Sequence, residues 1–429
     1  MNLASQTSTQ VKGPGPAVDA QPLARSHIHD FGRKLRQAST IGRLRAYVAW
    51  QRALRRGEAE PGPDTLPALP LVSINLDVAT ACNHACRFCV DADVINSGKN
   101  LRREAALETI ETLHADGLKS VILIGGGEPT LHPAFREIVR KIKSLGMQLG
   151  VVTNGTRLQK IIDVADELAP PDWVRLSLDA ARDETYQAIH NPHGKGNTLD
   201  SILARVPELR AAAPDLTVGY SFVVTWRGLV FDGFRLPDNI DEIPEAAERA
   251  RDAGFTYLAL KPCLEKTEAN RVETLALSIP KPDLDEVVGR IQDRIAEARA
   301  RVGEALVIHC SVNLTGMFEN RLEQLRVQPN TCHIGFLRQV ISPLGVYHCP
   351  AFRGDPVAYV AGPDAYASAA NVEASRQATA ARLLSYDARV GCRNIACFYN
   401  DVNWAIERMI ESEEEVAALE VVPDEEFFL

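Results

Sequence analysis

Three cysteines within one short stretch are the residues of this sequence best suited to chemistry. Cys82, Cys86 and Cys89 lie in ATACNHACRFCV and give the spacing C-x3-C-x2-C. Three thiolates this close along the chain can bind three irons of a cubane iron–sulfur cluster and leave the fourth iron open to another ligand. A zinc site would need a fourth protein ligand, and apart from His84 no C-x2-C or H-x3-H pair follows nearby. The spacing therefore favours a cluster over a zinc knuckle or simple apolar packing.

A glycine motif, GGGEP, follows the cysteines at Gly125, Gly126, Gly127, Glu128 and Pro129. Together, the cysteine spacing and this motif resemble the radical S-adenosylmethionine (SAM) superfamily. The resemblance implies that the open iron of a [4Fe-4S] cluster binds SAM, and that one-electron reduction gives a 5′-deoxyadenosyl radical that takes hydrogen from an unactivated carbon. It also implies that the three glycines and Glu128 bind the methionine part of SAM, with the backbone holding its amino group.

Four other residues occupy positions where the resemblance implies contacts with SAM. Phe88 lies between the second and third cysteines, where the family usually carries an aromatic residue beside the adenine. Asn154 lies in a TNG sequence at the end of the third predicted strand, a common family ending near the cofactor. Ser177 and Asp179 end the fourth strand, where the family often places a polar residue against the ribose. Only their order at successive strand ends gives these residues weight.

Four cysteines near the C-terminus form a second group: Cys332, Cys349, Cys392 and Cys397. Their spacing resembles the SPASM/twitch extension of the same superfamily, in a shortened, twitch-like form with one auxiliary [4Fe-4S] cluster. If cysteine fills all four iron sites, that cluster has no open iron for substrate, so electron transfer or structural support is its expected task. Buried thiols are the alternative interpretation.

Two cysteines remain. Cys263 ends the sixth predicted strand in YLALKPC, at the same end of the barrel as the cluster loop. A thiol S–H bond is weak enough to give a hydrogen atom to a carbon radical, and radical SAM epimerases use such a cysteine, so Cys263 is the predicted catalytic residue. Packing is the alternative for Cys263, and Cys310, in the apolar stretch VIHCSV, is predicted to be a core residue.

Strand and helix patterns alternate through the middle of the chain, which indicates a parallel α/β fold. The predicted strands are Val72–Val78, Ser120–Ile124, Gln148–Val152, Trp173–Leu178, Thr217–Val224 and Tyr257–Leu260. The clearest predicted helices between them are Arg102–Asp116, Pro133–Leu145 and Ile243–Ala253, and a helix at Asp283–Arg301 and a strand at Leu306–Ser311 are predicted to follow. Six βα units are two short of a closed barrel, so we expect a partial (β/α)6 TIM-like barrel with the cluster loop at its C-terminal face.

The predicted organisation has five parts. Residues 1–24 are polar and expected to be disordered, and residues 25–70 hold a basic amphipathic helix and a proline-rich linker. The barrel spans 71–311, the twitch-like module 312–410, and an acidic tail 411–429. The segment from Arg25 to Arg56 contains nine Arg or Lys residues and one Asp. The segment from Glu411 to Glu426 contains eight acidic residues and no basic one. We interpret both segments as solvated, although a basic helix could instead cover an anionic part of a substrate.

Composition limits the partners and the location. The net charge of −9 gives no support for a nucleic-acid surface, and no apolar run could span a membrane or serve as a signal peptide. We therefore expect a cytoplasmic protein without nucleic-acid or membrane partners, which receives electrons from a reductant such as flavodoxin or ferredoxin. The oligomeric state stays open.

These patterns predict a radical SAM enzyme that acts on a small molecule. An insertion from Trp226 to Asp241 mixes aromatic and charged residues, which suits a polyhydroxylated or aminated ligand as well as a solvated loop. Cys263 favours epimerisation, and a sugar or aminocyclitol from natural-product biosynthesis is the expected substrate. The alternatives are a dehydrogenase or dehydratase that passes an electron to the auxiliary cluster, a peptide maturase, and a non-catalytic metal-binding protein.

Overall fold

A computed structural model describes residues 29–62, 65–194, 196–266, 273–275 and 281–429 of the chain. The predicted disorder of residues 1–24 lies outside the described residues.

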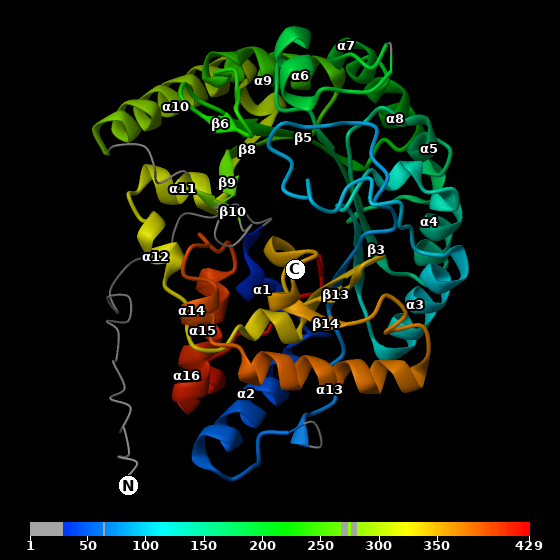
Figure 1. The fold of residues 1–429 in the computed structure, drawn as a ribbon, viewed down its shortest axis with the longest axis vertical. Helices are drawn as coiled ribbons and strands as arrows, with labels where there is room; N and C mark the ends of the chain where they lie inside the picture. The colour runs from blue at the N-terminus through cyan, green and yellow to red at the C-terminus, as the bar shows by residue number, and fades with distance from the viewer. Residues whose placement is uncertain (1–28, 63–64, 195, 267–272, 276–280) are drawn as a thin grey trace, which may run out of the picture.

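A curved sheet of ten strands forms the centre of the molecule (Figure 1). Its order is β11-β8-β5-β4-β3-β2-β1-β12-β13-β14, with parallel pairing from β11 to β12 and antiparallel pairing beyond. The strands are β1 (Ser73–Leu76), β2 (Ser120–Leu123), β3 (Gln148–Thr153), β4 (Trp173–Ser177), β5 (Thr217–Val224), β8 (Tyr257–Pro262), β11 (Val307–Cys310), β12 (Arg338–Ser342), β13 (Gly345–Tyr347) and β14 (Tyr359–Ala361).

The six predicted strands are confirmed, and the sheet extends beyond them at both ends. β11, which matches the strand predicted at Leu306–Ser311, is a seventh parallel strand beside β8, and β12 pairs in parallel with the opposite edge, at β1. β11 and β14 end the strand order and do not pair with each other in the described part of the chain, so the barrel is open. The predicted partial TIM-like α/β fold is therefore confirmed.

Helices line the outer face of this sheet as an arc (Figure 1). They are α3 (Arg103–Asp116), α4 (Phe135–Ser144), α5 (Gln159–Ile162), α6 (Asp183–His190), α7 (Leu199–Leu203), α8 (Val206–Ala212), α9 (Ile243–Ala253) and α10 (Lys281–Val302). The two faces of β4 differ accordingly: Val174 and Leu176 are fully buried under the helices, whereas Arg175 and Ser177 on the inner face are half-buried. Inner-face side chains thus remain accessible to a ligand.

The insertion between β5 and α9 folds as a small hairpin of β6 (Val230–Phe231) and β7 (Phe234–Arg235). Trp226 is buried in the barrel core. Phe234 lies under the guanidinium of Arg87, with 4.5 Å between the ring centre and Cζ. The insertion is therefore neither a purely solvated loop nor detached from the cluster loop, in which Arg87 lies. A second hairpin joins β9 (Leu264–Lys266) and β10 (Glu273–Leu275).

The C-terminal residues form helices that pack against the open side of the barrel and against the N-terminal helices. They are α11 (Val312–Phe318), α12 (Leu322–Arg326), α13 (Ala369–Ser385), α14 (Ala388–Gly391), α15 (Asn400–Glu411) and α16 (Glu413–Ala417). A second hydrophobic core joins α13 and α15 to the N-terminal helices α1 (Phe31–Leu35) and α2 (Ile41–Arg56). The division after residue 311 stays a proposal, because β12 links both parts through one sheet.

The basic N-terminal segment and the acidic C-terminal segment pair with each other. Three ion pairs join them, Arg33–Glu425, Lys34–Glu426 and Arg56–Glu413, and a fourth pair joins Arg55 to Glu407 on α15, just before the acidic segment. Arg52 also donates hydrogen bonds to the carbonyl oxygens at the end of α15, where a cation complements the helix dipole. The interpretation of two separately solvated segments is therefore wrong, since opposite charge brings them together. The helix α2 lies on the C-terminal helices, outside the barrel (Figure 1).

Glu407 is the most enclosed acid of this contact. It lies 2.7 Å from Arg55 and 2.8 Å from Nε2 of His333, whose Nδ1 is 2.7 Å from the hydroxyl of Tyr47. Burial lowers the pKa of His333, so a neutral imidazole can donate to Glu407 and accept from Tyr47. Although burial alone would raise the pKa of Glu407, the hydrogen bonds from His333 and Arg55 lower it to about 2.

We expect Glu407→Gln to lower the free energy of unfolding by about 2–3 kcal/mol at pH 7. A carboxylate whose pKa is depressed on folding stabilises the protein above its ordinary pKa of 4.5, and this contribution is lost as the pH falls towards 2. Denaturation melts at pH 7 and pH 3 measure the effect. The variant should lose less stability than the wild type between these two values. Glu413→Gln, at a fully exposed pair, should not change the melts, and equal effects of both variants would contradict this account.

The last residues of the chain close the N-terminal end of the barrel. The carbonyl oxygen of Phe427 accepts a hydrogen bond from the hydroxyl of Ser120, and its amide donates to the side chain of Gln148. The ring of Phe428 lies 5.4 Å from that of Trp173, at the start of β4. The C-terminus accordingly appears at the centre of the barrel in Figure 1.

We expect Phe428→Ala to lower the free energy of unfolding by about 3 kcal/mol or more, because only 4% of Phe428 is exposed and its removal leaves a cavity beside Trp173. The midpoint of urea denaturation measures the change. Val421→Ala is the matched control on the same segment, since Val421 is 47% exposed. Equal midpoints for the two variants would show that the tail does not close the barrel in solution.

Candidate functional site

The loop that carries Cys82, Cys86 and Cys89 follows β1 and lies across the carboxyl ends of the strands. Backbone hydrogen bonds attach it to the end of α6, from the amide of Ala85 to the carbonyl of His190 and from the amide of Arg87 to that of Ile189. The amide of Cys82 donates to the side chain of Asn96 at 2.9 Å. The loop follows β1 but is held by α6, which follows β4, three strands further along the sheet.

The three cysteines are half-buried and close enough to influence one another electrostatically. Burial is the largest influence on Cys82 and raises the pKa of its thiol to about 12, with further contributions from Glu128 and Cys86. Burial, Asp91 and Cys86 raise the pKa of Cys89 as well. Such thiols become thiolates only when a cation replaces their protons, which is the chemistry of cluster ligands. The donor set therefore fits a [4Fe-4S] cluster held by three cysteines.

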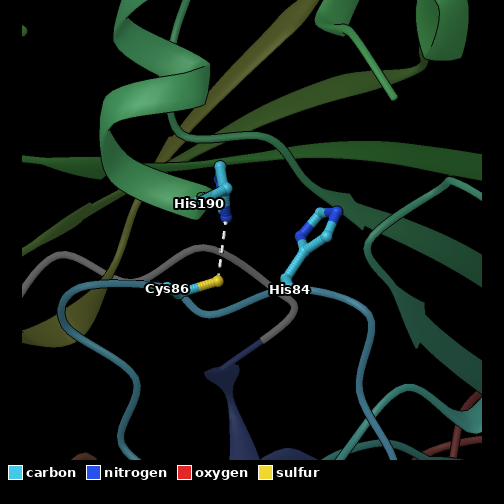
Figure 2. A group of neighbouring side chains, drawn as sticks. All are labelled: His84, Cys86 and His190. Carbon is cyan, nitrogen blue, oxygen red and sulfur yellow. Dashed lines mark hydrogen bonds between the residues drawn. The ribbon is translucent and has the colours of Figure 1, made fainter. Parts of the chain in front are cut away.

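Two histidines lie against Cys86, as Figure 2 shows. The Sγ atom of Cys86 lies 3.1 Å from Nδ1 of His190, and the Nε2 atom of His190 lies 3.0 Å from the carbonyl oxygen of Leu178. Ligand atoms of His84, Cys86 and His190 all lie within 4.8 Å of one another. Although burial lowers the pKa of His190, Cys86 and Asp179 outweigh it and raise that pKa to about 10. A hydrogen bond from His190 to a cluster sulfur would stabilise the reduced cluster.

The glycine motif follows β2 and packs directly on the cluster loop. The amide of Glu128 donates to the carbonyl oxygen of Ala81 at 2.8 Å, immediately before Cys82. A Cβ atom on Gly127 would lie 2.5 Å from that same oxygen, so no other residue fits there. Gly125 and Gly126 have φ values of +34° and +72°, which also favour glycine. Predicted SAM-binding backbone and predicted cluster ligands are thereby adjacent.

The side chain of Glu128 is only 2% exposed, and protein groups already occupy both of its oxygens. Oε1 accepts hydrogen bonds from the amide and hydroxyl of Thr130 and from the hydroxyl of Thr153, and Oε2 accepts from the amide of Asn154 at 2.7 Å. The side chain of Asn154 in turn donates to Asn83, in the cluster loop, at 2.8 Å. Glu128 and Asn154 therefore connect the ends of β2 and β3 to the cluster loop, and their predicted contacts with SAM stay predictions.

The three remaining predicted SAM contacts lie near β4 and α6. Phe88 packs against the barrel core, with its ring 6.4 Å from that of His190. Ser177 is half-buried on the inner face of the sheet. Asp179 is 3% exposed; its Oδ1 accepts from the amide of Val223 and its Oδ2 lies 3.3 Å from His190. These three contacts with SAM stay predictions, and the carboxylate of Asp179 holds β5 and His190.

The four C-terminal cysteines converge although they lie on separate elements. Cys332 and Cys349 each precede a short helical turn, on either side of the β12–β13 hairpin. Cys392 follows α14, and Cys397 lies between α14 and α15. Burial raises the pKa of Cys392 to about 12, with a contribution from Cys349. Burial also raises the pKa of Cys397, and the other three cysteines add to this shift. Four neighbouring thiols, of which Cys392 is buried and the other three are half-buried, fit the ligand set of a second cluster.

The two other cysteines lie on opposite faces of the sheet. Cys263 follows β8, is fully buried in the barrel core, and has its Sγ 4.0 Å from the carbonyl oxygen of Leu264. It shares the inner face with Lys261 by strand alternation. Cys310 pairs with Leu260, whose side chain lies under the outer helices, and burial raises the pKa of its thiol. Cys310 is thus half-buried and packed against the core, as predicted.

Sequence reasoning missed several residues of this site. His190 lies 104 positions from Cys86, and no local pattern connects the two. Asp91 and Arg353 form an ion pair across 262 positions. Their nearness to predicted ligands was the available signal, since Asp91 follows Cys89 by two residues and Arg353 follows Cys349 by four. Among the described residues, no helix is both long and apolar enough to span a membrane.

Comparison with known proteins places this geometry in a family. The model of the radical SAM superfamily matches residues 76–235. An S-adenosylmethionine-dependent nucleotide dehydratase of Flammeovirga pacifica is 33% identical over 123 residues, which cover 27% of this chain and 41% of the relative. A "Probable GTP 3′,8-cyclase" of Thermococcus kodakarensis is 30% identical over 215 residues, which cover 48% of this chain and 68% of the relative. The matches thus span between two fifths and about two thirds of these relatives.

Solved structures share the fold at low sequence identity. Streptococcus suis SuiB bound to its precursor peptide SuiA aligns with a TM-score of 0.53 and 13% identity, over 76% of this chain and 68% of SuiB. SuiB bound to S-adenosylmethionine aligns with a TM-score of 0.50 and 15% identity, over 67% of this chain and 62% of SuiB. With the matched sequence, the cluster loop and the adjacent glycine motif in agreement, the chain belongs to the radical SAM superfamily.

Proposed function

We propose that this enzyme uses a [4Fe-4S] cluster on Cys82, Cys86 and Cys89 to cleave SAM reductively and to abstract hydrogen from a carbon of a small-molecule substrate. The observation that carries the proposal is the contact between the glycine motif and the cluster loop, through the amide of Glu128 and the carbonyl of Ala81. When bound, the cluster and SAM supply a radical that abstracts hydrogen. The chain positions SAM, orients the substrate and excludes water.

The proposed outcome is epimerisation of a sugar or aminocyclitol, with Cys263 as hydrogen donor. Cys263 directly follows β8, and continued strand alternation would place it on the inner face, which supports this role, whereas Cys310 lies on the helix-covered face. Cys263 would give its S–H hydrogen to the substrate carbon radical from the opposite side, forming a C–H bond and leaving a sulfur radical. One electron and one proton would then restore the thiol. A reductant such as flavodoxin or ferredoxin, acting in the cytoplasm, would supply the electron through an auxiliary cluster on the four C-terminal cysteines.

Turnover in deuterated buffer tests the role of Cys263. The wild type should place solvent deuterium at the inverted carbon, because the S–H hydrogen exchanges with solvent. Cys263→Ala should still release 5′-deoxyadenosine but lose the epimer, and Cys310→Ala should behave like the wild type. Full epimer carrying solvent deuterium from Cys263→Ala would rule out this donor.

A nucleotide substrate, with dehydration or cyclisation as the reaction, is the second candidate. The names of the sequence relatives favour it, and so does the charge of the barrel interior. Arg175, Lys261 and His309 lie half-buried on the inner faces of β4, β8 and β11. They are close enough together that burial, Lys34 and these three side chains lower the pKa of His29 to about 3. A cationic interior suits the phosphate groups of a nucleotide.

Kinetics with Lys261→Gln separate the two candidates. A nucleotide substrate predicts a higher KM with little change in kcat, whereas an uncharged sugar predicts no change in KM. Arg103→Gln, on the outer surface of the barrel, is the control.

A peptide maturase and a non-catalytic metal-binding protein are the remaining alternatives. Release of 5′-deoxyadenosine excludes the non-catalytic protein, and a panel of sugars, nucleotides and peptides distinguishes the enzymes.

A further inference from the structure

A buried ion network connects the C-terminal cysteine region to the glycine motif. Arg353 follows the cysteine Cys349 by four residues, and only 5% of its side chain is exposed. Its Nε atom is paired with Asp77, and its Nη1 atom lies 2.7 Å from Oδ1 of Asp91. Asp77 directly follows β1, and Asp91 lies in the cluster loop just after Cys89. One guanidinium thus joins the C-terminal region to Asp77, before the cluster cysteines, and to Asp91, just after them.

The network continues from Asp91 to the glycine motif. The second carboxylate oxygen of Asp91, Oδ2, accepts a hydrogen bond from the amide of Gly126 at 3.2 Å. Asp91 therefore receives Arg353 on one oxygen and Gly126 on the other. A change at Arg353 would reach the backbone of the motif through a single side chain.

Arg353 also lies directly against the motif itself. A Cβ atom on Gly125 would come within 2.7 Å of both Cζ and Nη2 of Arg353. The guanidinium therefore occupies the space that any side chain at position 125 would need. Gly125 is required here by the approach of Arg353 and by its own φ of +34°, in addition to any role in binding SAM.

We propose that Arg353 is a positioning residue for the SAM site, through which the C-terminal region sets the conformation of Gly125 and Gly126. This inference rests on the proposed function, because it concerns the same site. It makes the affinity for SAM depend on a residue outside the barrel sequence that matches the family model, which ends at residue 235.

The charges of the network explain why Arg353 would control the loop. Two buried carboxylates face one guanidinium, so loss of Arg353 would leave Asp77 and Asp91 close together without a counter-charge. Burial is the largest influence on Asp77 and raises its pKa to about 7, while Arg353 acts in the opposite direction. Two buried carboxylates without a counter-charge repel each other, so they would move apart. This movement alters Asp91, which holds the amide of Gly126.

The test measures SAM affinity of Arg353→Gln after anaerobic cluster reconstitution. SAM is titrated against the oxidised protein, which cannot cleave it, and its binding is followed by equilibrium dialysis. We expect the Kd of SAM to rise at least about tenfold, with unchanged iron content. Arg389→Gln is the matched control, since Arg389 belongs to the same region but is exposed and pairs with Asp387. Its Kd should equal that of the wild type.

Two further variants separate positioning from a general loss of structure. Asp91→Asn interrupts the connection between Arg353 and Gly126, so adding Arg353→Gln to it should weaken SAM binding less than Arg353→Gln does alone. The double variant Arg353→Gln with Asp77→Asn removes both buried charges of one pair and serves if the single variant does not fold. It should also bind SAM more weakly than the wild type.

Each result has a distinct meaning. Wild-type SAM affinity in Arg353→Gln, or in the folded double variant with Asp77→Asn, would overturn the proposed positioning role alone. Strictly additive effects of Arg353→Gln and Asp91→Asn would also overturn it, because Arg353 would then not act through Asp91. If the reconstituted wild type itself binds no SAM, the proposed function fails.

Discussion

Replacing Cys86 by alanine is expected to reduce the formation of 5′-deoxyadenosine to background and to remove about four iron atoms per chain. Two cysteines cannot retain a cubane cluster whose third protein ligand is lost, and without the cluster SAM has no iron to bind. Iron analysis and chromatographic detection of 5′-deoxyadenosine measure the two effects.

His84→Ala is the matched control for Cys86→Ala, because it separates a cluster from a zinc site at the same place. The ligand atoms of His84, Cys86 and His190 lie within 4.8 Å of one another, so a zinc ion could use all three. With a cluster, His84→Ala should keep its iron and release 5′-deoxyadenosine. Loss of bound metal in His84→Ala, with zinc in the wild type, would contradict the assignment of Cys82, Cys86 and Cys89 as cluster ligands.

Replacing Cys397 by alanine is expected to remove a second group of about four iron atoms while the reductive cleavage of SAM continues. Cys397 is half-buried beside Cys332, Cys349 and Cys392, and each of these adds to the rise of its pKa. Substrate turnover should fall strongly, since the proposed electron path to Cys263 is interrupted. Iron content together with separate assays of 5′-deoxyadenosine and product measures these effects.

Cys310→Ala is the control for Cys397→Ala, because Cys310 is also half-buried but lies on β11 and is not among the cysteines that raise the pKa of Cys397. It should retain all of its iron. Unchanged iron in Cys397→Ala would show that the four C-terminal cysteines are packing residues. Loss of all iron and of 5′-deoxyadenosine would instead show that this region is needed for folding of the barrel.

The parts of the site that sequence could predict are those encoded locally. The three cysteines of the cluster loop lie within eight residues, and GGGEP is contiguous, so spacing alone brings out both. Strand ends were predictable for a similar reason, because an apolar run followed by a polar residue marks each carboxyl edge of a parallel sheet. These local signals place the cluster loop and the glycine motif at one end of the barrel, where the structure brings them into contact.

The contacts that organise the site depend instead on the folded topology. Arg353 meets Asp91 only because β12 pairs with β1 and brings the residues after β13 over the barrel mouth. His190 reaches Cys86 because α6 ends beside the cluster loop. Neither pair has a sequence signature, since an ion pair or hydrogen bond requires only two compatible side chains at any separation.

Charge patterns in two distant segments indicate a contact between them only when both segments are considered together. The basic segment around α2 and the acidic segment after α15 each suggest a solvated surface when they are considered alone. Their opposite signs are the better signal, because the two segments form three ion pairs, Arg55 pairs with Glu407 on α15, and α2 packs against α15. The sequence also did not show how the carboxylates of Glu128 and Asp179 are used. Both residues are predicted to contact SAM, but both carboxylates accept hydrogen bonds from backbone amides of the protein.

Release of 5′-deoxyadenosine from SAM is the measurement that tests the central claim most directly. The protein is reconstituted anaerobically with iron and sulfide, reduced with dithionite and incubated with SAM, with Cys86→Ala treated in parallel. The account predicts that the wild type releases 5′-deoxyadenosine and methionine in equal amounts and that Cys86→Ala releases neither above background. A wild-type protein that carries its full complement of iron and still releases no 5′-deoxyadenosine would contradict it.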